Sequence, residues 1–342
     1  MFEIKNNTPF QADIVVLPDK EGIDRIIAMT KATYFFDTVN KISLAEKQVP
    51  IYMGDEYFGE PGLSSIKYSS DIALCKRGTD VVMIGHAYAY KNSTTMVDAL
   101  FKVGPLKKII RVYGDRYWKY SIGMGSMTKP QPFDKMPIIY ERAFGGVDKN
   151  HYKKEKHAVE ERNPVGTGFR INKSKESIDG LPLPNIEDPF NEINSWKDKP
   201  KPVSFGFISP SWQPRLSYAG TYDEKWENEK MPFLPDDFDV KYFNSAPSDL
   251  ISPEYLKGDE NVEMYNLHPE KGSVEFKLPG VEVDVSFNIK DEIINTSAKL
   301  DTVVLEPDKN HFTLLWRASA ECFKKVLYVN SVTFEYKNRT QI

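Results

Sequence analysis

Apolar and polar residues alternate without a break in Val281-Glu282-Val283-Asp284-Val285-Ser286-Phe287-Asn288-Ile289. Successive side chains of a strand point to opposite faces, so this pattern predicts a strand with one face in a core and the other in solvent. The same alternation recurs at 97–103, where Gly104-Pro105 follows as a turn and 107–113 returns as the partner strand. A second hairpin is predicted where 300–305 and 311–318 flank Glu306-Pro307-Asp308-Lys309-Asn310.

Three further runs of β-branched and aromatic residues predict strands at 26–36, 80–90 and 326–336. In 80–90 the apolar residues lie on both sides of the strand, which predicts burial of both faces. No amphipathic helix of ordinary length is visible in residues 1–125. Strands without intervening helices indicate an antiparallel sandwich or barrel. We therefore expect a mainly β protein with antiparallel sandwich-like sheets and few short helices.

Residues 126–260 have a different composition. Fifteen of the 23 prolines lie between Pro130 and Pro253, and prolines at this density exclude central strands and long helices. The segment is nevertheless too rich in aromatic residues for a disordered linker. We expect an ordered loop layer over the sheets. The chain would then divide into a β-rich unit at 1–125, the loop layer at 126–260 and a C-terminal β unit at 261–342, or would form one continuous globule.

Charge and cysteine content restrict the class of protein. The chain has 342 residues, and its 45 Lys and Arg are interspersed with 49 Asp and Glu, without a basic arm that would indicate nucleic-acid binding. The mixed charged run 149–162 predicts a solvated loop or short helix. Two cysteines, Cys75 and Cys322, are typical of a reduced cytoplasm. The N-terminus lacks an apolar signal-peptide core, and no stretch is long enough to cross a bilayer. We expect a soluble cytoplasmic protein without membrane insertion.

Four carboxylates are candidates for catalysis: Glu141, Glu187, Asp223 and Glu224. Two of them could form the pair that glycoside hydrolysis requires, provided that they face each other across a cleft, with nearby Trp and Tyr stacking on sugar. The competing interpretation is structural, because carboxylates beside Gly, Asn or Arg in turns commonly accept backbone hydrogen bonds or pair locally.

Metal and nucleotide sites have weaker support. Asp236, Asp237 and Asp239 could supply oxygen ligands to calcium, but the EF-hand pattern is missing and a turn anchored by Phe238 is the alternative. The five histidines do not predict a zinc site: His86, His151, His157, His268 and His311. The glycine pairs lack a nucleotide-binding pattern, and no serine lies in a nucleophile elbow. We assign no catalytic, cofactor-binding or metal-binding residue.

A series of short peptides in the middle of the chain combines Gly or Pro with an aromatic and a charged or amide residue. This mixture is typical of ordered loops, in which an aromatic anchors a turn and a polar group bonds to backbone, and it favours binding over catalysis. The peptides are Tyr140-Glu141-Arg142-Ala143-Phe144-Gly145-Gly146, Asn163-Pro164-Val165-Gly166-Thr167-Gly168, Pro184-Asn185-Ile186-Glu187, Trp212-Gln213-Pro214-Arg215, Gly220-Thr221-Tyr222-Asp223-Glu224-Lys225-Trp226 and Asp236-Asp237-Phe238-Asp239.

Further short motifs occur on both sides of this series. They are Asn7-Thr8-Pro9-Phe10, Lys31-Ala32-Thr33-Tyr34-Phe35, Asp55-Glu56-Tyr57-Phe58-Gly59, Ser69-Ser70-Asp71-Ile72, Lys76-Arg77-Gly78-Thr79-Asp80-Val81, Gly85-His86-Ala87, Gly114-Asp115-Arg116-Tyr117-Trp118, Leu300-Asp301-Thr302 and Trp316-Arg317. In this order they make the chain resemble, over nearly its whole length, a large bacterial family catalogued as domain of unknown function twenty-one sixty-nine. Cys75 and the charged run 149–162 depart from the family pattern.

The resemblance implies a function in type VI secretion, because members of the family are encoded beside the genes of that system. It implies a non-enzymatic adaptor or chaperone that binds an effector toxin and helps to load it onto the spike, at a PAAR-type tip or a valine-glycine repeat protein. It implies no established binding residues. Two alternatives are a carbohydrate-active hydrolase that uses the carboxylates above and a secreted structural component of the spike.

Overall fold

The computed structural model describes residues 3–37, 39–121, 124–149, 156–171, 178–290, 292–322 and 326–338. Within these ranges the protein is mainly β, with several mostly antiparallel sheets and one short α-helix, α1 (Glu224–Glu229). This confirms the predicted fold class. No helix in the same ranges is long and apolar enough to span a membrane. Short 3-10 helices lie in the connections: η1 (Tyr140–Arg142), η4 (Arg215–Tyr218), η5 (Val240–Phe243), η6 (Ser248–Leu250), η7 (Pro307–Lys309) and η8 (Val326–Tyr328).

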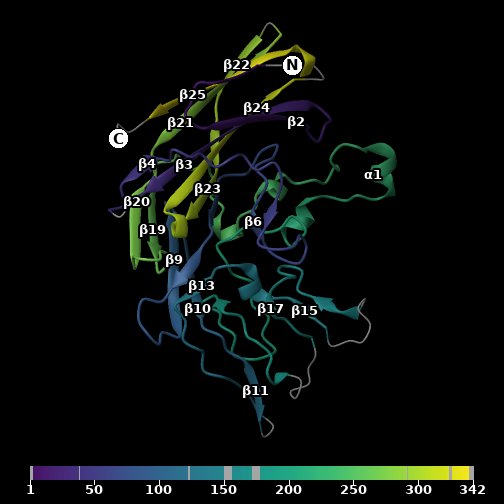
Figure 1. Ribbon diagram of the computed structural model, residues 1–342. Helices are drawn as coiled ribbons and strands as arrows, with labels where there is room; N and C mark the ends of the chain where they lie inside the picture. The colour runs from purple at the N-terminus through teal and green to yellow at the C-terminus, as the bar shows by residue number, and fades with distance from the viewer. Residues whose placement is uncertain are drawn as a thin grey trace.

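A six-stranded sheet forms the central layer (Figure 1). It has the order β2 (Gln11–Pro18), β3 (Asp24–Phe36), β24 (His311–Glu321), β23 (Lys299–Glu306) and β7 (Asp80–Met83), and β4 (Ile42–Leu44) pairs with β3. Antiparallel pairing of β23 and β24 around η7 confirms the predicted hairpin. β3 and β24 are buried along most of their length, because other parts of the chain cover both faces of this sheet.

A four-stranded sheet packs on one face of the central sheet. Its order is β1 (Glu3–Asn6), β25 (Val329–Asn338), β21 (Val281–Ile289) and β22 (Glu292–Ser297). The apolar side chains of β21 are buried and its polar ones are partly exposed, as the alternation predicts. Phe10 fills the space between the two sheets, stacking on Trp316 of β24 with 5.9 Å between ring centroids and meeting Tyr336 of β25 at 5.3 Å.

A five-stranded sheet extends the molecule toward its other end (Figure 1). Its order is β18 (Ile186–Glu187), β10 (Leu106–Tyr113), β9 (Met96–Val103), β19 (Asn261–Tyr265) and β20 (Ser273–Lys277). The predicted hairpin at Gly104-Pro105 is confirmed, with Val103 paired to Leu106. Phe276 of β20 stacks between Phe36 of β3 and Phe312 of β24, at 5.1 Å from each ring, and joins this sheet to the central one.

The predicted strand at 80–90 is two strands. β7 is completely buried and ends at Met83; after Ile84 and Gly85 the chain enters β8 (His86–Tyr88), which pairs with β13 (Lys135–Pro137) outside the central sheet. β7 pairs parallel with β23, and β1 pairs parallel with β25. The sequence did not predict either parallel pairing, because each joins strands that are far apart in the chain. The 326–336 strand is likewise shortened at its start, where η8 precedes β25.

The loop layer at 126–260 is ordered wherever the structure describes it. Phe205, Phe207 and Trp212 are buried in the main hydrophobic core together with Phe10 and Phe334, so this core includes residues from all three predicted segments. The short ladders of the molecule pair β5 (Glu56–Tyr57) with β6 (Ile66–Tyr68), β11 (Trp118–Ser121) with β12 (Met124–Met127), β14 (Phe144–Gly145) with β17 (Thr167–Gly168), and β15 (Val147–Asp148) with β16 (Ala158–Val159).

Part of the loop layer covers the second face of the central sheet. Leu234 and Phe243 pack there against Ile27 and Met29 of β3 and Leu315 of β24. The central sheet is therefore an inner layer, with strands on one face and loops on the other. This arrangement explains why β3 lacks the polar alternation of β21.

Candidate functional site

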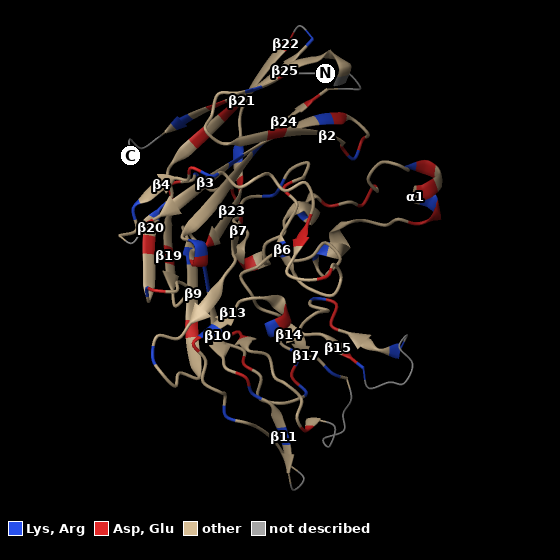
Figure 2. Ribbon diagram, viewed as in Figure 1, with Lys and Arg blue, Asp and Glu red and all other residues tan. Residues whose placement is uncertain are grey.

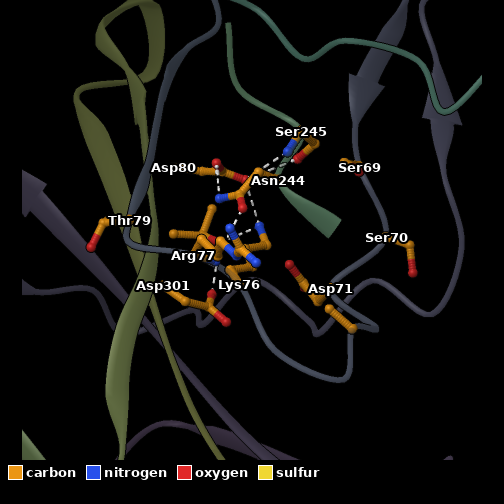
Figure 3. Close-up of polar contacts among 12 residues, drawn as sticks. Ser69, Ser70, Asp71, Lys76, Arg77, Thr79, Asp80, Asn244, Ser245 and Asp301 are labelled. Atoms are coloured by element: carbon orange, nitrogen blue, oxygen red, sulfur yellow. Dashed lines mark hydrogen bonds and ion pairs between the residues drawn. The ribbon is translucent and has the colours of Figure 1, made fainter. Parts of the chain in front are cut away.

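Asp80, the first residue of β7, holds part of the loop layer against the central sheet. Its carboxylate is completely buried and forms an ion pair with Lys76 at 2.8 Å. It also accepts hydrogen bonds from Asn244 Nδ2 at 2.9 Å and from the Ser245 backbone N–H at 2.8 Å (Figure 3). A buried carboxylate is costly unless its oxygens are bonded. These contacts satisfy it and fix residues 244–245 to β7.

The same network continues across the central sheet. Lys76 Nζ donates to Thr302 Oγ1 at 2.8 Å, and Thr302 Oγ1 donates to Asp301 Oδ1 at 2.8 Å. Asp301 pairs with Arg317 of β24. Arg317 in turn donates to the backbone carbonyl of Asp71 at 2.6 Å. Charged side chains from β7, β23 and β24 therefore hold the connection at 71–76 in place.

Lys31 of β3 binds the other end of this connection. Its ammonium lies 2.7 Å from Asp71 Oδ2 and 4.0 Å from the centre of the Tyr52 ring. Burial lowers the pKa of Lys31, and the Asp71 carboxylate opposes that shift. Lys31 and Asp71 are both nearly inaccessible to solvent, so this pair belongs to the scaffold.

Gly78 shows why this connection needs its particular sequence. The residue has φ +80°, and a Cβ atom built on it would lie 1.8 Å from the carbonyl oxygen of Ser252. Only glycine permits this approach of two backbone segments. The 76–81 motif, the Asp301-Thr302 motif and Arg317 therefore meet in one buried network, although they are far apart in the sequence.

A cleft of about 490 Å³ lies directly beside this network. Two segments of the loop layer, 201–218 and 241–251, supply most of its lining, and Arg77, Lys108 and Tyr140 contribute from other parts of the chain. Val203, Ile208 and other apolar side chains form much of the walls. A cleft of this size, with apolar walls and a few polar groups, is typical of a binding site.

Arg215 joins the two segments that line the cleft. Its Nε donates to the carbonyl of Tyr242 at 2.8 Å, and its Nη1 donates to the carbonyl of Ile208 at 2.7 Å. The backbone N–H of Ile208 donates to the Ser245 carbonyl at 2.7 Å. Asn244, which also lines the cleft, donates to Asp80 and accepts from the Arg77 backbone N–H at 3.0 Å (Figure 3). The buried network therefore preorganises the cleft.

Positive charge predominates in the lining. Arg77, Lys108, Arg162, Lys201, Arg215 and Lys241 are basic, against the acidic Asp188 and Asp249. Along the ribbon as a whole, residues of both signs are interspersed (Figure 2).

The cations of the lining differ in how closely they are paired, and Arg162 binds Glu160 at 2.6 Å. Lys108 pairs with Asp249 at 3.0 Å, and burial lowers the pKa of its ammonium. Arg77 and Lys241 share the carboxylate of Asp239 at the longer distances of 3.7 and 3.8 Å.

Lys201 and Arg215 have no ion-pair partner among the residues that the structure describes. Lys201 donates to the Ser248 hydroxyl at 3.1 Å, and Arg215 donates to backbone carbonyls. Burial lowers the pKa of Arg215, but a guanidinium remains charged at neutral pH. The cleft can therefore accept additional negative charge.

The four candidate carboxylates for hydrolysis lie in structural surroundings. Glu141 accepts hydrogen bonds from the Ser65 backbone N–H and hydroxyl, both at 2.7 Å. Glu187 forms a buried ion pair with Arg116 and accepts from the Ile193 N–H at 2.8 Å. Burial raises the pKa of Glu187, and Arg116 opposes the shift.

Asp223 caps helix α1 by accepting from the Trp226 N–H at 2.9 Å, and Glu224 lies exposed in the first turn of that helix. None of these four residues lines the cleft.

The acidic cluster at 236–239 is divided among separate partners. Asp236 pairs with Lys230 at 2.7 Å, and Asp237 accepts from the Thr221 N–H and hydroxyl. Asp239 caps η5. In the described part of the chain no three His, Cys, Asp or Glu side chains are grouped to hold a metal ion.

Three of the described histidines have polar side-chain partners. His86 lies 2.6 Å from Asp308, His268 lies 2.7 Å from Asn310, and His311 lies 2.6 Å from Glu306. His157 also has a partner. His151 and part of the charged run 149–162 lie outside the described residues. Cys75 is exposed and Cys322 is buried, and neither is in a disulfide.

A family model described as "Uncharacterized protein conserved in bacteria (DUF2169)" matches residues 21–317. The chain belongs to this family. The matched region includes the Asp80 network and the whole lining of the cleft, and it confirms the resemblance drawn from the short motifs. No curated protein and no solved structure matches the chain.

The sequence indicated the 126–260 layer, which supplies most of the cleft lining, but it identified no binding residue there. Arg215 lies in one of the quoted peptides and Arg77 in another, whereas Lys108, Lys201 and Lys241 lie in none of them. The available signal was the density of proline and aromatic residues in 200–218. Nothing local in the sequence shows that Lys108 of β10 faces that segment.

Proposed function

We propose that this family member is a non-enzymatic adaptor or chaperone that binds a type VI secretion effector. It would help to load the effector onto the spike, at a PAAR-type tip or a valine-glycine repeat protein, and would act in the cytoplasm before secretion. The observation that carries the proposal is the preorganised cleft, which has apolar walls and incompletely neutralised cations. Such a surface suits reversible protein binding.

The polar motifs of the chain support the same interpretation. Asp80, Lys76, Asp301 and Arg317 belong to one buried network beside the cleft, in which each charge has a partner. Glu141 and Glu187, two of the four candidates for hydrolysis, bind Ser65 and Arg116. These structural tasks of the charged motifs support a binding role over a catalytic one.

The test is recovery of the tagged protein from its native host after mild crosslinking, with identification of the proteins that accompany it. We expect an effector and a spike-tip protein encoded near this gene to be enriched over an untagged control. The culture medium should contain the spike proteins without this protein. Absence of both partners would contradict the proposal, and release of this protein with the spike would favour the structural-component alternative.

A further inference from the structure

We infer that the cleft binds an extended, acidic and partly apolar segment of the protein partner; this inference rests on the proposed function and specifies its binding chemistry. Lys201 and Arg215 line the cleft without a carboxylate partner among the described residues. Arg77 and Lys241 share one distant carboxylate. A ligand carboxylate entering the cleft would therefore meet cations that the protein itself leaves incompletely paired.

The walls of the cleft indicate that the ligand carries apolar residues as well as carboxylates. Val203, Ile208 and Ile251 offer apolar surface beside these cations. A simple polyanion such as a nucleic-acid backbone would leave that surface unused, whereas a peptide that combines Asp or Glu with apolar residues would cover both parts. The volume of about 490 Å³ accommodates a few side chains, so a short segment of the partner is sufficient.

An exposed aromatic residue lies close in sequence to the lining. Phe190 is 87% exposed, and its backbone N–H donates to the side chain of Asp188 at 2.9 Å. Asp188 lines the cleft, so this turn holds the backbone of Phe190 two residues from the lining. Aromatic residues in such positions are the usual anchors of protein interfaces. We include Phe190 in the proposed docking surface.

The cleft is already shaped before any ligand enters. Arg215 fixes Ile208 to Tyr242, and Asp80 fixes Asn244 and Ser245. Preorganisation reduces the entropy that binding must overcome. A segment of the partner would therefore be ordered by the cleft, with little rearrangement of the adaptor.

The experiment compares wild type with a Lys201→Glu/Lys241→Glu variant, which reverses two exposed charges of the lining. The matched control is Lys107→Glu/Lys135→Glu, which makes the same change in net charge at exposed positions outside the lining. The probe is a fluorescein-labelled peptide of alternating Leu and Glu, and its counterpart replaces each Glu with Gln. Binding is followed by fluorescence polarisation at low and high salt.

We expect the acidic peptide to bind wild type and the control variant equally, and to bind the cleft variant about tenfold or more weakly at low salt. The Gln peptide should bind weakly to all three proteins. Equal binding of both peptides, or equal binding to both variants, would overturn the inference. Displacement of the acidic peptide by single-stranded DNA or anionic vesicles at lower concentrations than unlabelled peptide would also overturn it.

A second arm separates this inference from the proposed function. A partner recovered from the native host is tested against the same three proteins by biolayer interferometry. If the partner binds the cleft variant as tightly as wild type, the adaptor function stands and the cleft is not its docking site. If no effector or spike protein is recovered but the acidic peptide binds in the cleft, the ligand chemistry stands and the secretion function fails.

Discussion

Lys76 and Asp80 form a buried ion pair, with 2.8 Å between Nζ and Oδ2 and nearly no solvent access to either side chain. The two residues are only four apart in the sequence, but their other hydrogen bonds reach Thr302 in β23 and the loop at Asn244 and Ser245. It therefore connects the central sheet to the wall of the cleft. A buried charge whose partner is removed has no water to replace the lost contact.

The first prediction concerns this pair. Asp80→Asn should reduce the free energy of unfolding by about 3–5 kcal/mol, because it leaves the Lys76 ammonium buried without its counter-ion. Urea unfolding followed by tryptophan fluorescence measures the loss. The control is Asp284→Asn, which removes an exposed pair with Lys337 and should have a much smaller effect. Similar losses in both variants would show that the buried network is not a major source of stability.

Gly78 gives a second prediction. Gly78→Ala should prevent normal folding or cost several kcal/mol, on the order of the largest single-residue effects, since the new Cβ would meet the Ser252 carbonyl at 1.8 Å and φ is +80°. Gly54→Ala is the matched control, because nothing lies within 4 Å of a Cβ at that position. Yield of folded protein and melting temperature provide the comparison. A Gly78→Ala protein as stable as the control would be inconsistent with the described backbone.

Glu306 should make stability depend on pH. Burial alone would raise the pKa of its carboxyl, but hydrogen bonds from His311, Lys309 and Tyr68 lower it to about 2. A depressed folded-state pKa means that the contribution is complete above the unfolded value of about 4.3 and is lost as the pH falls toward 2. The shift corresponds to a contribution on the order of 3 kcal/mol at neutral pH.

Glu306→Gln isolates this contribution. We expect the variant to be less stable than wild type at pH 7, and the difference between the two free energies of unfolding to shrink between pH 4 and pH 2. Chemical denaturation at several pH values measures both curves. A difference that stays constant over this range would mean that the carboxyl does not titrate as the geometry requires.

Substitutions of Glu141 test whether its carboxylate has a structural or a catalytic role. Glu141→Ala should cost about 1–3 kcal/mol, because the Ser65 N–H is left without its acceptor. Glu141→Gln should retain much of the stability, since an amide can accept from the Ser65 N–H and donate to its hydroxyl. Thermal unfolding of both variants provides the measurement. Turnover of a glycan that is lost in Glu141→Gln while the fold is intact would favour the hydrolase alternative.

Substitution of Phe190 should weaken binding of the partner without reducing the stability of the protein. Phe190→Ala removes an exposed aromatic, so the melting temperature should hardly change, whereas affinity for the partner should fall by about tenfold if the residue is an interface anchor. Leu63→Ala is the control, because Leu63 is also exposed, at 73%, and does not line the cleft. Equal affinity of the two variants would exclude Phe190 from the docking surface.

Local sequence patterns were sufficient to predict the strands that are covered on one face. β21 shows this directly, because each polar residue between Val281 and Ile289 reports which side of the strand faces solvent. The hairpins at Gly104-Pro105 and at η7 could also be predicted, since a turn and its two flanking strands are contiguous in the chain. Parallel pairing of β7 with β23 could not, because no local signal identifies a partner that is remote in the sequence.

The sequence by itself determined a mainly β protein with an ordered loop layer, because strand alternation and the density of proline and aromatic residues are local properties. The tertiary structure alone decided where the charges act. It buried Lys76 and Asp80 below the loops and brought Lys108 of β10 beside Arg215 and Lys201 at the cleft. Burial and long-range proximity determine whether a charged residue stabilises the fold or remains available to a ligand, and neither can be read from residue order.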